Sequence, residues 1–275
     1  MNLKTPRGED KSKDPLAYEK PEFLKSPEAR SVRILSEYLD PLREFRQHKI
    51  HDTMIFFGSA RIPSPEEKGF DTHPMARYYK ECRELARRMT EWSMSLEHSK
   101  RMFVVCTGGG PGIMEAANRG AIDAEGYSIG LNIGLPLEQY PNPYISKELS
   151  FEFHYFFMRK FWFAYLAKAM VAFPGGFGTL DELTEILTLA QTRKLHKKMV
   201  CLLYGTSFWK KIVNFDALVE YGMISPEDLD LFHFADDVDT AFEILRDGLT
   251  NLYLNPEVPL PEAEVKTPAI ASSRV

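Results

Sequence analysis

Short apolar runs alternate with segments of helical periodicity from residue 53 to residue 251 of this chain. The apolar runs lie at 53–60, 101–112, 127–136, 151–156, 169–176, 199–205 and 231–235. The segments that predict helices lie at 73–97, 113–126, 158–169, 179–194, 208–222 and 238–251. Alternation of this kind predicts a parallel sheet, and runs that are apolar throughout predict helices on both faces. We therefore expect an α/β fold, a three-layer sandwich with a central parallel sheet.

A separate helical arm is expected before this sheet. Residues 1–25 are polar and predict a loose segment. Behind them, apolar residues recur at helical spacing and predict an amphipathic helix over 27–47, packed on the main fold or on a partner subunit. These residues are Val32, Leu35, Leu39, Leu42 and Phe45. The expected division is an arm and helix at 1–50, the main domain at 51–252 and a mobile tail at 253–275.

Charge and composition narrow the class of function. The net charge is −5, which is unlike the basic footprint of a nucleic-acid-binding protein. No apolar run is long enough to cross a bilayer, and the dispersed residues Cys82, Cys106 and Cys201 predict reduced thiols. The seven histidines show no metal-ligand spacing, so we expect no metal. The interpretation is a cytoplasmic protein that acts on a small molecule, without a nucleic-acid or membrane partner.

Two glycine-rich turns each follow a predicted strand and precede a predicted helix. They are Thr107–Gly112 and Pro174–Thr179. Glycine lets a ligand approach the backbone, and the helix N-terminus offers unpaired N–H groups, so such a turn suits a phosphate. The alternative is that the glycines only make tight turns. Two such turns in one domain favour a nucleotide or sugar phosphate, although neither turn has the Walker sequence or a clean GxGxxG.

The second turn also carries a resemblance to a known family. Residues 174–182, PGGFGTLDE, fit PGGxGTxxE, and Met158-Arg159-Lys160 stands upstream. GSAR at 58–61 and TGGGPGIMEAANRGA at 107–121 agree with the same pattern. From about residue 53 to 248 the chain resembles the LOG family, named for the plant "Lonely Guy" protein and formerly labelled lysine decarboxylase. The segment GIMEAAN resembles the sequences of the larger bacterial subgroup of this family. The resemblance implies a Rossmann-like domain.

The resemblance also implies a reaction, the hydrolysis of the N-glycosidic bond of nucleoside 5′-monophosphates to free base and ribose 5-phosphate. The substrates would be AMP or cytokinin riboside monophosphates, and no cofactor is expected. By resemblance, Arg159 and Glu182 are the catalytic pair. The expected phosphate and ribose ligands are Gly109, Gly110, Gly112, Gly175, Gly176, Gly178 and Thr179.

Weaker candidates for ligand contact are Ser59, Met158, Lys160 and Glu115. Ser59 could equally cap a turn, Glu115 suits a helix surface, and Lys160 suits electrostatic support. Asp181 and Glu185 are interpreted as partners of the helix dipole or as solvent-facing acids. A set of aromatic residues is assigned to the core or a subunit interface rather than to base stacking. These are Phe156, Phe157, Phe161, Trp162, Phe163 and Tyr165.

Other functions remain open on the same pattern. One is a non-catalytic carrier of a nucleotide or molybdenum cofactor on this scaffold. Another is the old lysine decarboxylase label, which would need pyridoxal phosphate on a lysine, and no lysine here has such a context. A DNA-handling relative is disfavoured by the acidic balance. By resemblance we expect a homodimer or higher homo-oligomer, with interfaces at the helices over 156–168 and 27–47.

Overall fold

The computed structural model describes residues 14–96, 100–134, 140–195 and 197–255. The first 13 residues of the expected arm and the expected tail from residue 256 onward lie outside this part of the chain. Residues 253 and 254, the first two of the expected tail, belong to a π-helical turn, Thr250–Leu254, that follows the last helix. No helix in the described ranges is long and apolar enough to cross a membrane.

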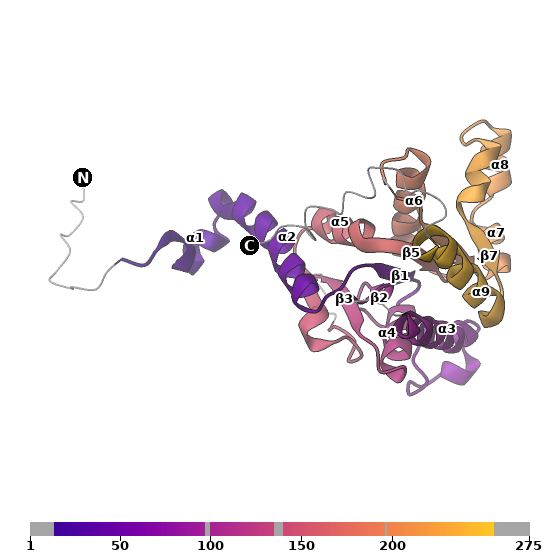
Figure 1. The fold of residues 1–275 in the computed structure, drawn as a ribbon, viewed down its shortest axis with the longest axis horizontal. Coiled ribbons are helices and arrows are strands. Elements are labelled where there is room, and N and C mark those ends of the chain that lie inside the picture. Colours follow the sequence, from indigo (N-terminus) through magenta and orange to yellow (C-terminus); the bar gives the residue numbers. More distant parts are fainter. Residues whose placement is uncertain (1–13, 97–99, 135–139, 196, 256–275) are drawn as a thin grey trace.

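A seven-stranded sheet with every neighbouring pair parallel forms the centre of the molecule, as expected (Figure 1). The strand order is β4-β3-β2-β1-β5-β6-β7. The strands are β1 (Thr53–Phe57), β2 (Val104–Thr107), β3 (Ser128–Ile133), β4 (Ser150–Phe153), β5 (Ala167–Ala172), β6 (Val200–Tyr204) and β7 (His233–Ala235). Every residue of β1, β2 and β6 is buried, which agrees with helices on both faces.

Helices cover both faces and complete a three-layer α/β sandwich (Figure 1). Met54 and Phe56 point into a core shared with α3, α4 and α9, whereas Ile55 and Phe57 point into a core shared with α2, α5, α6 and α7. The helices are α1 (Pro21–Lys25), α2 (Arg30–Gln47), α3 (Ala76–Ser95), α4 (Ile113–Asp123), α5 (Phe156–Leu166), α6 (Phe177–Gln191), α7 (Thr206–Ile212), α8 (Phe215–Glu220) and α9 (Val238–Leu249). The expected fold class is therefore confirmed.

Strand β1 lies at the point where the order of strand addition reverses. The chain runs outward from β1 through β2 and β3 to β4, and then returns so that β5 pairs with the other side of β1. Ligands in open parallel sheets bind beyond the carboxyl ends of the strands at such a reversal. Here the loops after β1 and β5 meet directly, since Ser59 N donates to Pro174 O at 3.0 Å.

Helix α2 is the predicted amphipathic helix, but several of its apolar residues are exposed. Leu42 and Phe45 are buried, whereas Val32, Leu35 and Leu39 are 44%, 53% and 49% exposed. A carboxylate in the middle of α2 ties this helix to α5. Glu37 accepts hydrogen bonds from His154 N at 2.8 Å and Tyr155 N at 3.2 Å, just before α5 begins.

Two predicted helices have different bounds in the structure. The segment expected to stay helical to residue 169 ends at Leu166, because the residues from Ala167 onward pair with β1. The single helix expected over 208–222 is two helices, α7 and α8. The break lies at Asn214, whose side chain caps α8 by accepting from Ala217 N at 3.0 Å.

Candidate functional site

A cavity of about 730 Å³ opens at the carboxyl ends of β1 and β5, where the loops after these strands meet. We call it the strand-end cavity. Its wall includes both glycine turns and both members of the expected catalytic pair. The residues that line it are Phe57, Gly58, Ser59, Ala60, Arg61, Gly108, Gly110, Met114, Asn132, Ile133, Phe156, Arg159, Gly175, Gly176, Phe177, Gly178, Thr179, Leu180, Glu182 and Ile212.

The second glycine turn presents free backbone donors to this cavity. Helix α6 begins at Phe177 with Gly176 as its N-cap, so the N–H groups of residues 177–179 have no carbonyl partner within the helix. No other acceptor among the described residues takes them up. A Cβ atom added at Gly176 or Gly178 would meet nothing within 4 Å. Packing within the protein therefore does not require glycine at either position, and the open space suits a ligand close to the backbone.

Two of the four glycines of the first turn, Gly109 and Gly112, have a structural reason instead. Gly109 and Gly112 have φ angles of 73° and 69°, which favour glycine. A Cβ at Gly109 would lie 2.0 Å from Asn132 Oδ1, and one at Gly112 would lie 2.3 Å from Ser59 O. Of the three predicted ligands in this turn, only Gly110 lines the strand-end cavity, together with its neighbour Gly108.

A buried network of amides and hydroxyls holds the first turn in place. Asn142 Nδ2 donates to Gly109 O at 3.1 Å, to Gly110 O at 3.0 Å and to Asn118 Oδ1 at 2.9 Å. Asn118 also accepts from the Thr107 hydroxyl at 2.7 Å. Because these groups are buried, each unmade bond would carry a large penalty, and the network keeps the turn rigid.

The expected catalytic pair meets at one side of the cavity. Arg159 Nη2, on α5, lies 3.4 Å from Glu182 Oε1, on α6. The guanidinium also lies between two aromatic rings, 5.6 Å from the centre of Phe156 and 5.4 Å from that of Phe163. Arg159 Nε is buried and has no hydrogen-bond partner. The pair therefore retains hydrogen-bonding capacity for a ligand.

Burial sets the protonation behaviour of Glu182, which is only 4% exposed. Burial raises the pKa of this carboxyl above its ordinary value, and the nearby charges of Lys160 and Arg159 partly oppose that rise. A carboxyl whose pKa is shifted by burial beside specific charges, in a cavity wall, is typical of a functional site.

Lys160 does not line the cavity, but its ammonium group lies close to Glu182 and to two neighbouring carboxylates. Its Nζ lies 2.6 Å from Glu185 Oε2, 2.8 Å from Asp181 Oδ2 and 3.7 Å from Glu182 Oε1. Burial lowers the pKa of Lys160, but its hydrogen bonds to Asp181 and Glu185 together with the negative charges of Glu182 and Glu185 raise it by more, so the ammonium form is favoured. Asp181 and Glu185 thus have a specific partner beyond the helix dipole proposed from the sequence.

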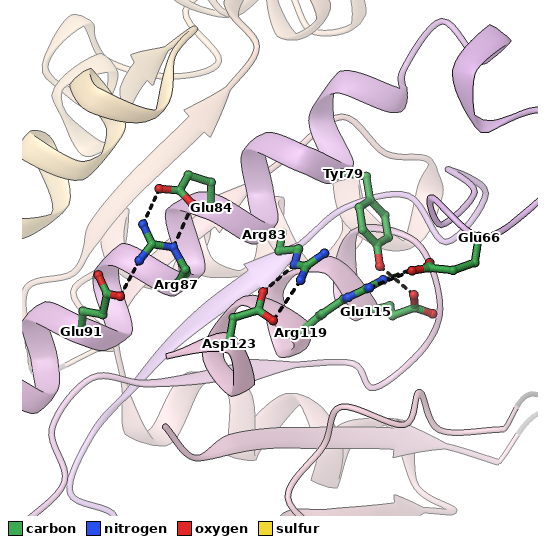
Figure 2. Close-up of polar contacts among 9 residues, drawn as sticks. All are labelled: Glu66, Tyr79, Arg83, Glu84, Arg87, Glu91, Glu115, Arg119 and Asp123. Carbon is green, nitrogen blue, oxygen red and sulfur yellow. Dashed lines mark hydrogen bonds and ion pairs between the residues drawn. The ribbon is translucent and has the colours of Figure 1, made fainter. Parts of the chain in front are cut away.

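The remaining weak candidates are dispersed. Ser59 lines the cavity and also caps its own turn by accepting from Arg61 N at 3.1 Å, so both interpretations of this residue agree with the structure. Met158 is buried and does not line the cavity. Glu115 faces α3, where it accepts from Tyr79 Oη at 2.7 Å (Figure 2). It belongs to a series of polar contacts between α3, α4 and the loop at Glu66.

Sequence reasoning missed several residues of the cavity wall. Phe156 was assigned to the core or an interface, but it is half-exposed and lines the cavity, whereas Trp162 and Phe163 are buried as expected. Phe177, which is 92% exposed, and Arg61 also line it. Arg61 directly follows the small residues at the end of β1, and that position at a strand end was a usable signal.

No group of three or more metal-binding side chains lies together in the described part of the chain.

A second cavity of about 670 Å³ lies between the end of α2 and the end of α3, and it contains none of the predicted site residues.

The sequence profile of a family described as "possible lysine decarboxylase" matches residues 114–245, a segment that contains Arg159, Glu182 and the second glycine turn. The same chain is similar to curated plant proteins of the LOG group. The family match covers just under half of this chain. One relative is the cytokinin riboside 5′-monophosphate phosphoribohydrolase LOG7 of Arabidopsis thaliana, 44% identical over 69 residues, which are 25% of this chain and 31% of the relative.

A second similar protein is the probable cytokinin riboside 5′-monophosphate phosphoribohydrolase LOGL5 of Oryza sativa subsp. japonica. It is 32% identical over 134 residues, which are 45% of this chain and 50% of the relative. The chain thus matches about a third to a half of the length of these relatives. Among solved structures, the molybdenum cofactor carrier protein of Chlamydomonas reinhardtii aligns over 73% of this chain and 99% of its own, with 20% identity and a TM-score of 0.46.

Proposed function

We propose that this chain hydrolyses the N-glycosidic bond of nucleoside 5′-monophosphates. Water adds to C1′ of the ribose, the bond from C1′ to the base nitrogen breaks, and the base leaves with a proton, so the products are free base and ribose 5-phosphate. The observation that carries the proposal is the Arg159–Glu182 pair in the wall of a cavity that also contains the open N-terminus of α6.

The phosphate is placed at the N-terminus of α6. The free N–H groups of residues 177–179 and the open space at Gly176 and Gly178 support this placement. The helix dipole adds a partial positive charge at the same point, which favours a dianionic group. Phosphate and carboxylate sites are then separated by about one helical turn, which is the length that a ribose must span.

Glu182 serves the sugar in this proposal. Cleavage of an N-glycosidic bond passes through an oxocarbenium-like state with positive charge at C1′, and a buried carboxylate stabilises such a charge better than one in water. In its ionised form Glu182 also accepts a hydrogen bond from a ribose hydroxyl. Arg159 orients the carboxylate, and its charge favours the ionised form against the effect of burial.

A lysine decarboxylase would place a lysine where its amine can reach the cofactor. The described residues that line the strand-end cavity include no lysine, and Lys160 is engaged by the carboxylates behind it. This geometry favours a hydrolase over the activity in the family description.

The reaction is tested by incubating the protein with AMP, CMP, GMP, UMP and N6-isopentenyl AMP and following free base by chromatography. We expect base release from at least one nucleotide, together with an equal amount of ribose 5-phosphate. The relative rates rank the bases and separate AMP-type from cytokinin-type substrates. If the folded protein releases no base from any of them, the hydrolase proposal is wrong and a carrier of intact ligand becomes the better account.

We also propose that the chain acts as a homo-oligomer, as its family resemblance suggests. The exposed residues Val32, Leu35 and Leu39 of α2 and the half-exposed Phe157 on α5 supply apolar surface for a contact between copies. Light scattering that finds a monomer with full activity would contradict this proposal.

A further inference from the structure

The loop that follows β1 carries an arginine into the strand-end cavity. Gly58, Ser59, Ala60 and Arg61 all line this cavity. The loop is fixed at three points, since Ser59 N donates to Pro174 O at 3.0 Å, Ser59 O accepts from Ile113 N at 3.1 Å, and the Ser59 hydroxyl accepts from Arg61 N at 3.1 Å. The backbone of Arg61 is therefore held next to the second glycine turn.

Among the described residues of the cavity wall, Arg61 is the cation without an ion-pair partner. Arg61 and Arg159 are the two cationic residues in the described cavity wall. Arg159 is engaged with Glu182 and lies against two aromatic rings. For the Arg61 guanidinium, by contrast, no ion pair or side-chain hydrogen bond is found within the described ranges, and the side chain is exposed toward the cavity. Its five N–H donors are available for a ligand.

The group that matches this arrangement is a phosphate monoester. Its oxygen atoms would accept hydrogen bonds from the N–H groups at the start of α6 on one side. On the other side they would accept hydrogen bonds from the guanidinium group of Arg61, in the loop after β1. The positions without a side chain at Gly176 and Gly178 leave room for its oxygen atoms. Arginine binds phosphate oxygens in pairs, which adds both affinity and orientation.

We propose that Arg61 binds the 5′-phosphate of the substrate and makes the enzyme select nucleotides over nucleosides. This assignment rests on the proposed function and sharpens it, because it separates the two arginines by role. Arg61 recognises the phosphate, and Arg159 acts on Glu182 and the sugar.

The test compares a substrate that has the phosphate with one that lacks it. We expect Arg61→Ala to lower kcat/KM for AMP by about 10- to 100-fold, the usual loss for a charged hydrogen-bond partner. Hydrolysis of adenosine, which is slow in both proteins, should change less than about twofold. Arg61→Lys should recover part of the loss, because it restores the charge but not the fork. Equal losses for AMP and adenosine would overturn the proposal.

A binding measurement separates this inference from the reaction itself. Ribose 5-phosphate and ribose are titrated into the wild type, Arg61→Ala and the control Arg246→Ala, whose partly exposed arginine on α9 does not line the cavity. We expect ribose 5-phosphate to bind the wild type and the control alike, and Arg61→Ala about 10- to 100-fold more weakly. This result would support the phosphate role even if no nucleotide were hydrolysed. Equal affinity for Arg61→Ala, or no difference between ribose 5-phosphate and ribose in the wild type, would refute it.

Discussion

Arg159 Nη2 lies 3.4 Å from Glu182 Oε1, although the two residues are 23 positions apart in the chain. A charge-assisted hydrogen bond of this type is usually about 2.7–2.9 Å long, so the contact is loose. A loose contact leaves the carboxylate free to accept a hydrogen bond from a ligand, and pairs of this kind tighten when substrate is bound. The rigid elements α5 and α6 hold both side chains at the end of β5.

Lys160 should control the pH at which the enzyme becomes active. Burial raises the pKa of Glu182, and the charge of Lys160 lowers it again. If the ionised carboxylate is the active form, activity falls as the pH drops through this pKa. Lys160→Met removes the opposing charge, so the pKa rises further and the acidic limb of the kcat/KM profile should move to higher pH. Lys160→Arg, which keeps the charge, is the matched control and should leave that limb in place. A profile for Lys160→Met that superimposes on the wild type contradicts this role.

Glycines in the two turns should respond differently to alanine. Gly178→Ala places a methyl group in open space, so stability should be unchanged or rise by less than about 1 kcal/mol, while the added methyl occupies ligand space and raises KM. Gly109→Ala combines a φ of 73° with a contact at 2.0 Å to Asn132 and should lose about 2 kcal/mol or more. Urea denaturation and steady-state kinetics separate the two effects. An unstable Gly178→Ala protein would show that glycine is required there for folding.

Asn142 should couple stability to substrate binding, because it holds the carbonyl groups of Gly109 and Gly110. Asn142→Ala leaves these buried groups without a donor, and we expect a loss of about 1–3 kcal/mol together with a raised KM. Asn214→Ala removes an exposed helix cap at a cost of about 1 kcal/mol and serves as the control. Its KM should equal that of the wild type. If the two variants have the same KM, the network stabilises the fold without positioning the first turn.

Much of the fold was predictable because the signals are local. All seven apolar runs became strands, and in inner strands such as β1 and β6 burial on both faces removes any need for alternation. Both glycine turns fall where strand and helix periodicity meet. The break at Asn214 was missed because the apolar pattern continues across it, whereas a single capping residue is enough to start a new helix.

The site was less predictable because its contacts join distant segments. Arg61 and the second glycine turn line one cavity because β5 pairs with β1. No local sequence pattern predicts this order of strands. The ion pairs of Lys160 with Asp181 and Glu185 depend on how α5 and α6 face each other. Phe156 illustrates the same limit, since apolar character alone does not distinguish a core aromatic from one that lines a cavity.

The central claim concerns Glu182, and the most direct test is base release from AMP by wild type and Glu182→Gln. The substitution keeps the shape of the side chain but removes the negative charge. We expect the variant to fold, as judged by circular dichroism and thermal unfolding, and to bind ribose 5-phosphate. Its kcat should fall by about 10²–10⁴-fold, the contribution of a group that acts on charge in the transition state. Free adenine released by Glu182→Gln at the wild-type rate would contradict the account.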